Sequence, residues 1–326
     1  MKQLPKGFTL TELMVSVALG IILVAGVIEV YSGSRQTYRT QEALARLQEN
    51  ARLAIEILSR DLRMSGNVGC ENITNVAPAQ TVGLTGMPYD NSFATWGGQR
   101  VGNLNTGALS NDAIRTAIDA DNIAEDSDIL IVQSAGRCSM PLSADMLAAD
   151  GVITTAANTC SFSDGDYALV SNCSSAGLFR INTVAGGVIT PSASVGDLYG
   201  TSDGAEVLSF SSNTYFVDDD NGIPSLFVLD NTQAGAAFAL IEGVESIQVE
   251  YGRDDDDDDI PNRYVDADQA GDFTAVTSVR ITLLMRTREE NIGSQATTFA
   301  VGGTNRTYPA GPLRQQFVTT IGLRNI

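Results

Sequence analysis

The 326-residue chain contains no histidine, and this absence removes several classes of function at once. Without imidazole the chain cannot form a histidine-based catalytic triad, a histidine metal site or a histidine general base. Carboxylates are abundant, but no pair stands out from its surroundings as a glycosidase-type acid and nucleophile. We therefore expect a protein that is not an enzyme, with a membrane-anchored hydrolase as the enzymatic alternative.

Positive charge is also scarce. The chain has 20 Lys and Arg against 39 Asp and Glu, which gives a formal net charge of −19 and a pI of about 4.2. Its only two lysines, Lys2 and Lys6, lie before the first apolar segment. Nucleic-acid binding requires clustered Lys and Arg that contact phosphates, so the composition argues against a direct nucleic-acid partner.

The apolar segment near the start organises the rest of the chain. Residues 8–28 are mostly apolar, and as a helix rising about 1.5 Å per residue they span roughly the hydrocarbon thickness of a bilayer. Residues 1–7 are short and basic, which predicts that they stay on the cytoplasmic side. We expect residues 8–28 to be transmembrane and the remainder of the chain to lie on the opposite side.

Two features distinguish this segment from a cleaved secretory signal. The small residue Gly7 precedes the apolar run, so cleavage after it would keep the helix in the mature protein. Glu12 places a carboxylate inside the apolar span, where a charge costs about 2.5–3.5 kcal/mol. Cleavage after Gly7 would free the amino group of Phe8 to pair with Glu12, in the same subunit or in a neighbouring copy. An ordinary anchor that tolerates one polar residue is the simpler alternative.

The segment GFTLTELMVSVAL, residues 7–19, closely resembles the class III signal of type IV pilins and pseudopilins. The resemblance implies that a prepilin peptidase of the inner membrane cleaves between Gly7 and Phe8 and that Phe8 is then N-methylated. It also implies that Glu12 forms an assembly salt bridge with the amino terminus of an adjoining subunit. Several later segments resemble the PilW family of minor pilins: residues 60–70, 241–252, 263–265, 279–286 and 323–325.

The pattern after residue 28 predicts an α+β protein, and the resemblance implies that its fold is of the type IV pilin kind. Apolar residues recur at steps of three and four from Leu44 to Leu62, so we expect one helix over residues 8–64 that ends near Gly66. We expect residues 71–128 to be loops with short irregular elements. Short apolar runs bounded by turn residues predict a β-rich head over residues 65–326, in these strands: 129–133, 167–170, 178–183, 206–210, 215–217, 226–229, 246–251, 279–285 and 316–323.

All four cysteines, Cys70, Cys138, Cys160 and Cys173, follow the membrane segment. A non-cytoplasmic location permits disulfides, and the chain has no Cys-x-x-Cys pair that would indicate a zinc site. Four cysteines allow three pairings. Their spacing favours Cys160 with Cys173, across a short loop, and Cys70 with Cys138, between the end of the helix and the head.

An acidic run, Asp254 to Asp259, is the most unusual local feature of the head. Alternate aspartates on a tight loop can direct several oxygens at a hard cation, so Asp254, Asp256 and Asp258 form a candidate Ca²⁺ site. PilW-like proteins carry an Asp-x-Asp-x-Asp-Gly type of turn here, and this chain lacks the glycine. A solvated acidic loop is the alternative. Residues Asp218, Asp220 and Asn221 form a weaker second candidate, in a predicted hairpin turn.

The resemblance implies a minor pilin that helps to prime type IV pilus assembly at the inner membrane and then sits at the pilus tip, supporting piliation and twitching motility. Its implied partners are the prepilin peptidase, the inner-membrane assembly machinery, other minor pilins, the major pilin and a tip adhesin. The alternatives are the large minor pseudopilin of a type II secretion system and a tip-displayed adhesive binding module. Before assembly the head would lie in the periplasm, and after assembly at the cell surface.

Overall fold

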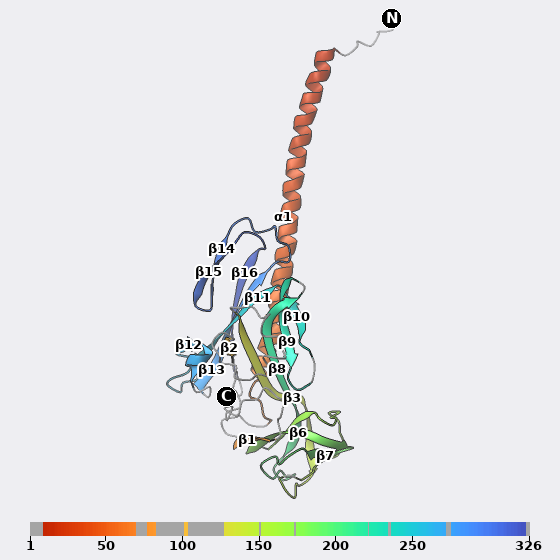
Figure 1. Cartoon of the computed structure of the whole chain (residues 1–326), viewed down its shortest axis with the longest axis vertical. Helices are drawn as coiled ribbons and strands as arrows, with labels where there is room; N and C mark the ends of the chain where they lie inside the picture. Colours follow the sequence, from red (N-terminus) through yellow and green to blue (C-terminus); the bar gives the residue numbers. More distant parts are fainter. Residues whose placement is uncertain are drawn as a thin grey trace.

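A computed structural model describes residues 9–69, 77–82, 101–103, 127–149, 151–172, 174–220, 222–233, 236–271 and 275–323 of the chain. Figure 1 shows one long helix that projects from a strand-rich head, with the N-terminus at the far end of the helix. This architecture confirms the predicted α+β, pilin-like fold class. The predicted leader, residues 1–7, and Phe8 lie outside the described residues.

The helix α1 (Leu10–Met64) ends at the residue that the sequence pattern predicts. Gly66 follows it with a φ of 73°, a left-handed conformation that glycine adopts without a steric cost and that terminates helices. The chain then pairs with the head: the N–H of Gly66 donates to the carbonyl of Gln133, and the N–H of Ala135 donates to the carbonyl of Asn67. These two hydrogen bonds join the segment after α1 to residues 133–135, which belong to the first long strand.

Within the described residues the strands form three sheets. The largest sheet contains β1 (Ala77–Val82), β2 (Val101–Asn103), β3 (Asp128–Ala144), β4 (Ile153–Thr155), β5 (Tyr167–Ser171), β6 (Ser175–Ala185), β7 (Val188–Pro191), β8 (Glu206–Asp220), β9 (Ile223–Asp230) and β10 (Phe238–Glu242). A four-stranded sheet follows the order β12 (Arg263–Val265), β11 (Val244–Arg253), β13 (Val276–Arg286) and β16 (Arg314–Gly322). The hairpin β14 (Thr297–Val301) and β15 (Thr304–Tyr308) forms the third, and α3 (Ala267–Ala270) is a single helical turn.

The C-terminal half of α1 packs against the head through one apolar stripe. Ala43, Leu47, Ala51, Ala54, Leu58 and Leu62 are its buried residues. They meet the inward face of the four-stranded sheet, which the alternating residues Ile247, Val249 and Tyr251 of β11 and Val279 to Met285 of β13 supply. The fully buried Ala51 and Ala54 let the helix approach the sheet closely. This shared core confirms the alternation that the sequence shows in β11 and β13.

A buried polar contact also joins α1 to the largest sheet. The hydroxyl of Tyr215 on β8 donates to Oδ2 of Asp61 at 2.5 Å, and Nδ2 of Asn213 donates to the same oxygen at 3.3 Å. Burial, and next the Asp61 carboxylate, raise the pKa of Tyr215, so its phenol stays protonated and remains a donor. The contact connects the last turns of the helix to a strand about 150 residues later in the chain.

The end of the head farthest from the N-terminus is a small closed barrel, residues 139–210, which we call the distal barrel (Figure 1). The strands pair in a circuit, β8–β5–β6–β7–β4–β3, and β3 pairs with β8 again to close it. Leu208 of β8 lies between Leu169 of β5 and Ser139 of β3, which is where the circuit closes. The barrel has its own core, which includes Phe179, Ile153 and Tyr199 and is separate from the core beneath α1.

Two strands are longer than their hydropathy predicts. The runs 206–210 and 215–217 belong to one strand, β8, because the polar residues between them are buried but bonded. Ser212 and Thr214 have no exposed surface, and both accept hydrogen bonds from the side-chain amide of Asn231. Likewise β3 continues to Ala144, well beyond the predicted end at Gln133. The predicted hairpin between β8 and β9 is confirmed.

We expect Tyr215→Phe to lower the free energy of unfolding by about 2 kcal/mol, because hydrogen bonds to charged groups contribute about 1.5–3 kcal/mol. Denaturant unfolding of the full chain in detergent, followed by circular dichroism, measures the difference. Tyr38→Phe is the matched control, since Tyr38 is a tyrosine of α1 that is 67 % exposed. Equal stabilities for the two variants would contradict the role assigned to the Asp61 contact.

Candidate functional site

Glu12 lies in the first turn of α1, where the structure shows a reciprocal cap with Thr9. The backbone N–H of Thr9 donates to Oε2 of Glu12 at 3.0 Å, and the N–H of Glu12 donates to the Thr9 hydroxyl oxygen at 3.3 Å. A capping box of this kind satisfies two N–H groups that the helix itself leaves unpaired. In the single subunit the Glu12 carboxylate is therefore engaged locally, while its side chain is exposed. The predicted cleavage and methylation positions, Gly7 and Phe8, lie outside the described residues.

The N-terminal half of α1 has no cover from the rest of the chain. Every large apolar side chain from Leu10 to Val30 exposes more than half of its surface, and the first buried residue of the helix is Ala43. Among the described residues, α1 is the one helix that is long and apolar enough to cross a membrane. The exposed segment includes Tyr31 and Tyr38, which follow the apolar span and are 67 % exposed. An apolar surface of this extent requires lipid or other helices around it.

The predicted cysteine pairing is wrong. Cys138 at the β3 bulge bonds to Cys160 in the loop before β5, with Cα atoms 5.7 Å apart. The bond excludes both Cys70–Cys138 and Cys160–Cys173, and Cys70 and Cys173 lie outside the described residues. Proximity in sequence misled the prediction because β3 and the loop after β4 are brought together by the closed barrel. The disulfide spans 22 residues and ties the loop across the barrel to β3.

The acidic run forms a tight loop after β11, closed around Asp254. This residue is only 6 % exposed, and its Oδ1 accepts the N–H groups of Asp256 at 3.0 Å and Asp257 at 2.9 Å. Its Oδ2 accepts the N–H of Asp259 at 2.7 Å. Burial disfavours the charged form, but these backbone donors outweigh it and hold the pKa of Asp254 below its usual value. Asp254 is thus a structural carboxylate as well as a candidate ligand.

The loop achieves its tight turns without the glycine that the resemblance leads one to expect. Asp257 and Asp259 have φ values of 59° and 63°, in the left-handed region that aspartate tolerates better than most residues. Asp255 takes no part in the inward-facing cluster, because its carboxylate pairs with Arg253 at 2.6 Å and Arg263 at 3.0 Å. These ion pairs hold the pKa of Asp255 below its usual value as well, chiefly through the hydrogen bond from Arg253.

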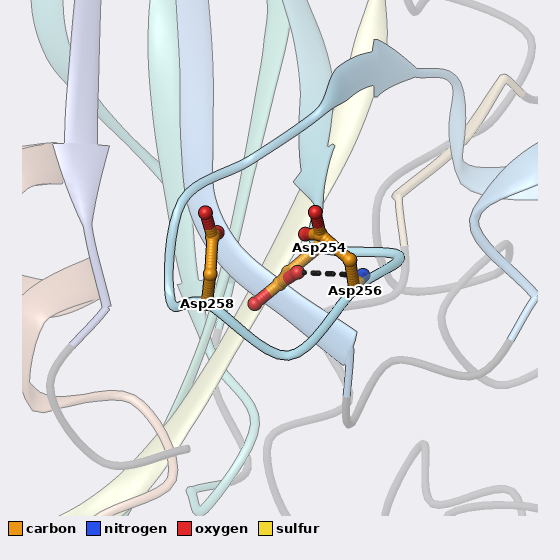
Figure 2. A group of neighbouring side chains, drawn as sticks. All are labelled: Asp254, Asp256 and Asp258. Carbon is orange, nitrogen blue, oxygen red and sulfur yellow. Dashed lines mark hydrogen bonds between the residues drawn. The ribbon is translucent and has the colours of Figure 1, made fainter.

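Three of the aspartates converge. Asp254, Asp256 and Asp258 each offer a carboxylate oxygen, and the three atoms lie within 4.8 Å of one another. Figure 2 shows the Asp254 side chain reaching between Asp256 and Asp258 on the two sides of the loop. Oxygens on opposite sides of one Ca²⁺ lie about 5 Å apart, since each bond measures about 2.3–2.6 Å, so the spacing fits a single ion. In the part of the chain that the structure describes, no other cluster of three or more potential metal-ligating residues has its ligand atoms this close together.

The weaker candidate at the β8–β9 turn is a hairpin turn. The N–H of Gly222 donates to the carboxylate of Asp219, and the N–H of Asp219 donates to Oδ1 of Asp218 at 2.7 Å. Asn221 and the side chain of Asp220 lie outside the described residues. The Asp219 carboxylate thus closes the turn. Asp219 is not one of the three residues of the predicted site.

A half-buried carboxylate that the sequence did not reveal, Asp128, lies at the start of β3. Its Oδ2 accepts the N–H of Val249 at 2.8 Å, and beside it the hydroxyl of Ser127 accepts the N–H of Ile247 at 3.0 Å. These two side chains accept hydrogen bonds from backbone N–H groups of β11 that are not paired with another of the described strands. Burial, and to a lesser extent the nearby Asp266, raise the pKa of Asp128 to about 6 against the opposing effect of the Val249 N–H. Nothing in the sequence around Asp128 indicated the contact with Val249 or the raised pKa.

Comparison with known families agrees with this geometry. Residues 4–28 match the prokaryotic N-terminal methylation motif, and residues 214–325 match the family described as type IV pilus-assembly protein W. No curated protein and no solved structure gives a significant match. The methylation motif, the long apolar helix and the strand-rich head define a type IV pilin-like protein. Within that class the two matches support a PilW-like minor pilin of the type IV pilus.

The family matches indicate a general class of function for the chain. Pilin-related families are generally structural and not enzymatic. The apolar helix and the methylation motif indicate membrane anchoring, and the family indicates contacts with other pilins and with the pilus assembly machinery. The family match covers the strands from the end of β8 to β16, which include most of those that pack against α1, and it does not extend to the distal barrel.

The raised pKa of Asp128 predicts a pH dependence of known sign. Between about pH 4 and pH 6 the folded protein holds a proton on Asp128 that the unfolded chain has released, so stability falls as the pH rises through this window. Asp128→Asn removes this effect. We expect the free-energy difference between the native protein and the variant to shift by at most about 3 kcal/mol from pH 4 to pH 7, in favour of the variant.

Denaturant unfolding of both proteins across this pH range makes the measurement. Asp254 and Asp255 are present in both proteins, so their opposite contributions, which are lost as the pH falls, cancel in the difference. A difference that does not change with pH would show that Asp128 titrates normally.

Proposed function

We propose that this PilW-like protein helps to prime type IV pilus assembly at the inner membrane and is carried to the pilus tip. The observation that carries the proposal is the uncovered N-terminal half of α1 with a single carboxylate, Glu12, in its first turn. Such a helix is stored in the bilayer as a single span and then packs among other helices in a filament. The work of the protein is assembly, with surface pili and twitching motility as its outcome.

In this proposal residues 1–7 are a leader that prepilin peptidase removes after Gly7, and residue 8 then becomes a methylated N-terminal phenylalanine. Residues 8–64 form the assembly helix, and residues 65–326 form a head in the periplasm that later reaches the cell surface. The methylation-motif match at residues 4–28 supports this division. The new amino group of Phe8 lies one residue before Thr9, whose N–H already contacts Glu12.

The proposed docking step exchanges one partner of Glu12 for another. Before docking the carboxylate caps its own helix through Thr9, which limits the cost of holding it near the bilayer. During docking the amino terminus of a neighbouring pilin would become its ionic partner. Because an unpaired charge in an apolar surround is strongly unfavourable, this pairing supplies register as well as attraction. Other minor pilins, the major pilin and the inner-membrane assembly machinery are the proposed partners, with a tip adhesin beyond them.

We expect Glu12→Val to leave a stable, membrane-inserted protein that no longer enters pili, because the docking charge is lost while the apolar helix remains. Immunoblots of sheared surface filaments and of membranes, together with twitching assays, measure the effect. Glu29→Val is the matched control, since it removes a carboxylate from the same helix just beyond the predicted span. Normal piliation and incorporation of the Glu12→Val protein would overturn the proposal.

Two further readouts make this experiment specific. Intact mass of the membrane protein reports whether the chain begins at methylated Phe8, so a failure of processing is not mistaken for a failure of docking. Deleting the gene and measuring both pili and exoprotein secretion separates the pilus from a type II secretion system. Loss of secretion with normal pili would assign the chain to the secretion system, and normal pilus numbers with failed attachment would favour an adhesive module.

A second candidate property rests on the converging aspartates. We propose that Asp254, Asp256 and Asp258 bind one Ca²⁺, which would relieve the repulsion among the exposed carboxylates of the loop and stiffen it. Oδ1 of Asp254 already accepts two backbone N–H groups, whereas Oδ2 accepts one and keeps a lone pair for a cation. The ion would have a structural role in holding the loop between β11 and β12.

We expect millimolar Ca²⁺ to bind the full chain in detergent and to raise its melting temperature by a few degrees, since binding to the folded state stabilises it. Calorimetric titration and thermal melts measure both effects. The double variant Asp256→Asn, Asp258→Asn should abolish them. The pair Asp257→Asn, Asp259→Asn removes the same charge from the loop and should leave binding in place. Absence of both heat and stabilisation in the native protein would reject the site.

A further inference from the structure

A cavity of about 350 Å³ lies on the outer face of the four-stranded sheet, away from α1. Its floor consists of Gln248 and Glu250 of β11, Thr282 of β13 and Gln316 of β16. Strand geometry explains their direction: Ile247, Val249 and Tyr251 face the core beneath α1, so the residues between them face the other way. No part of the predicted function uses this face.

The cavity has walls and a roof built from different elements. Tyr264 of β12 and Asp266 next to α3 form one wall, and Asp128 at the start of β3 closes the end. The roof is the tip of the β14–β15 hairpin, where Gly302 and Gly303 take φ values of 55° and 72°, as the turn of a tight hairpin requires.

The β14–β15 hairpin contacts two residues of the cavity floor, Gln316 and Gln248. Nε2 of Gln316 donates to the carbonyl of Ala300 at 3.0 Å. A Cβ on Gly302 would lie 3.2 Å from Oε1 of Gln248, which is a tight contact, so the tip of the hairpin packs closely against the sheet. The hollow is therefore held open by the fold and is not a gap between loosely placed segments.

The lining offers mostly hydrogen-bond acceptors. Three carboxylates, those of Asp128, Glu250 and Asp266, surround the cavity, and no Lys or Arg lines it. Arg280 lies at its margin, where it contacts Glu250 at 3.4 Å and covers the ring of Tyr264 at 3.5 Å. An anionic ligand would meet repulsion here, whereas hydroxyl and ammonium groups would find acceptors.

Several of these groups keep unused hydrogen-bonding capacity. Asp266 occupies the N-cap position of α3 but makes no capping hydrogen bond. Within the described residues the side chains of Thr282 and Gln269 make no hydrogen bond either, and Asp128 uses one oxygen only. Hydroxyl and amide groups both donate and accept, so a ligand with several hydroxyls could satisfy them together.

The spacing of the carboxylates argues against a metal ion at this place. Acidic oxygens close enough to share one ion occur, among the described residues, in the loop at Asp254 and not around this cavity. A volume of about 350 Å³ is at the small end of the range for ligand pockets and exceeds what a single ion fills. The ligand must therefore be an organic molecule of modest size.

We propose that this cavity binds a hydroxyl-rich molecule of monosaccharide size, neutral or amino-substituted, and rejects the anionic counterpart of the same molecule. Such a site would give the head a ligand-binding property that does not depend on pilus assembly. The acceptor-rich walls select against acids, and the mixed amide and hydroxyl floor pairs with ring hydroxyls.

Three sugars with the same ring test the proposal: glucosamine, glucose and glucuronate, which are cationic, neutral and anionic. Binding to the full chain is measured by ligand-observed NMR at about pH 7, in a detergent whose head group contains no sugar, where the Asp128 carboxyl is ionised. We expect glucosamine to bind at least tenfold more tightly than glucose, and glucuronate not to bind. Equal binding of glucuronate, or no binding of any of the three at about 50 mM, would overturn the proposal.

Matched variants locate the site. Thr282→Val and Asp266→Asn should each weaken glucosamine binding at least fivefold. Thr320→Val makes the same change as Thr282→Val on an exposed residue of β16 outside the cavity lining, and it should have no effect. Melting temperatures confirm that the variants fold. Binding that Thr282→Val and Thr320→Val change equally would place the sugar elsewhere and reject this cavity.

Discussion

One continuous helix of 55 residues has to be stable in two solvents, and this constraint shapes the molecule. In hydrocarbon every backbone polar group needs an internal partner, which a helix provides without help from other segments. The same helix then needs a single apolar stripe where it meets the head, and this stripe begins at Ala43. Because α1 does not break between the two regions, the head is held at a fixed direction from the membrane segment (Figure 1).

The head is divided according to this constraint. The four-stranded sheet and the adjoining part of β3, β8, β9 and β10 cover α1 and share its core. The distal barrel has a separate core and a disulfide, and among the described residues its core cluster contains no residue of the helix. The family match at residues 214–325 follows the first of these regions. Most of the strands that pack against the helix thus lie inside the family match, and the distal barrel lies outside it.

Two carboxylates of α1 stabilise its two ends. The carboxylate of Glu12 completes the first turn of α1, and Asp61 near the opposite end holds the last turns against β8. The chain has a net charge of −19, and two of its acidic clusters lie where water or a ligand can reach them, in the loop after β11 and around the cavity on the outer sheet face. The buried Asp254 and the half-buried Asp128 are each stabilised by backbone N–H groups that donate to their carboxylates.

Local patterns determined the membrane segment, the extent of α1, the fold class and the alternating strands β11 and β13, because hydrophobic periodicity and helix-ending glycine act within a few residues. The cluster Asp254, Asp256 and Asp258 was visible for the same reason, since one loop contains it. The Cys138–Cys160 bond, the unbroken length of β8 and the cavity around Asp128 were decided by tertiary structure. Each depends on which strands lie side by side: barrel closure brings the two cysteines together, Asn231 satisfies the buried polar residues of β8, and a hairpin folds over a sheet face that the pattern alone assigns to solvent.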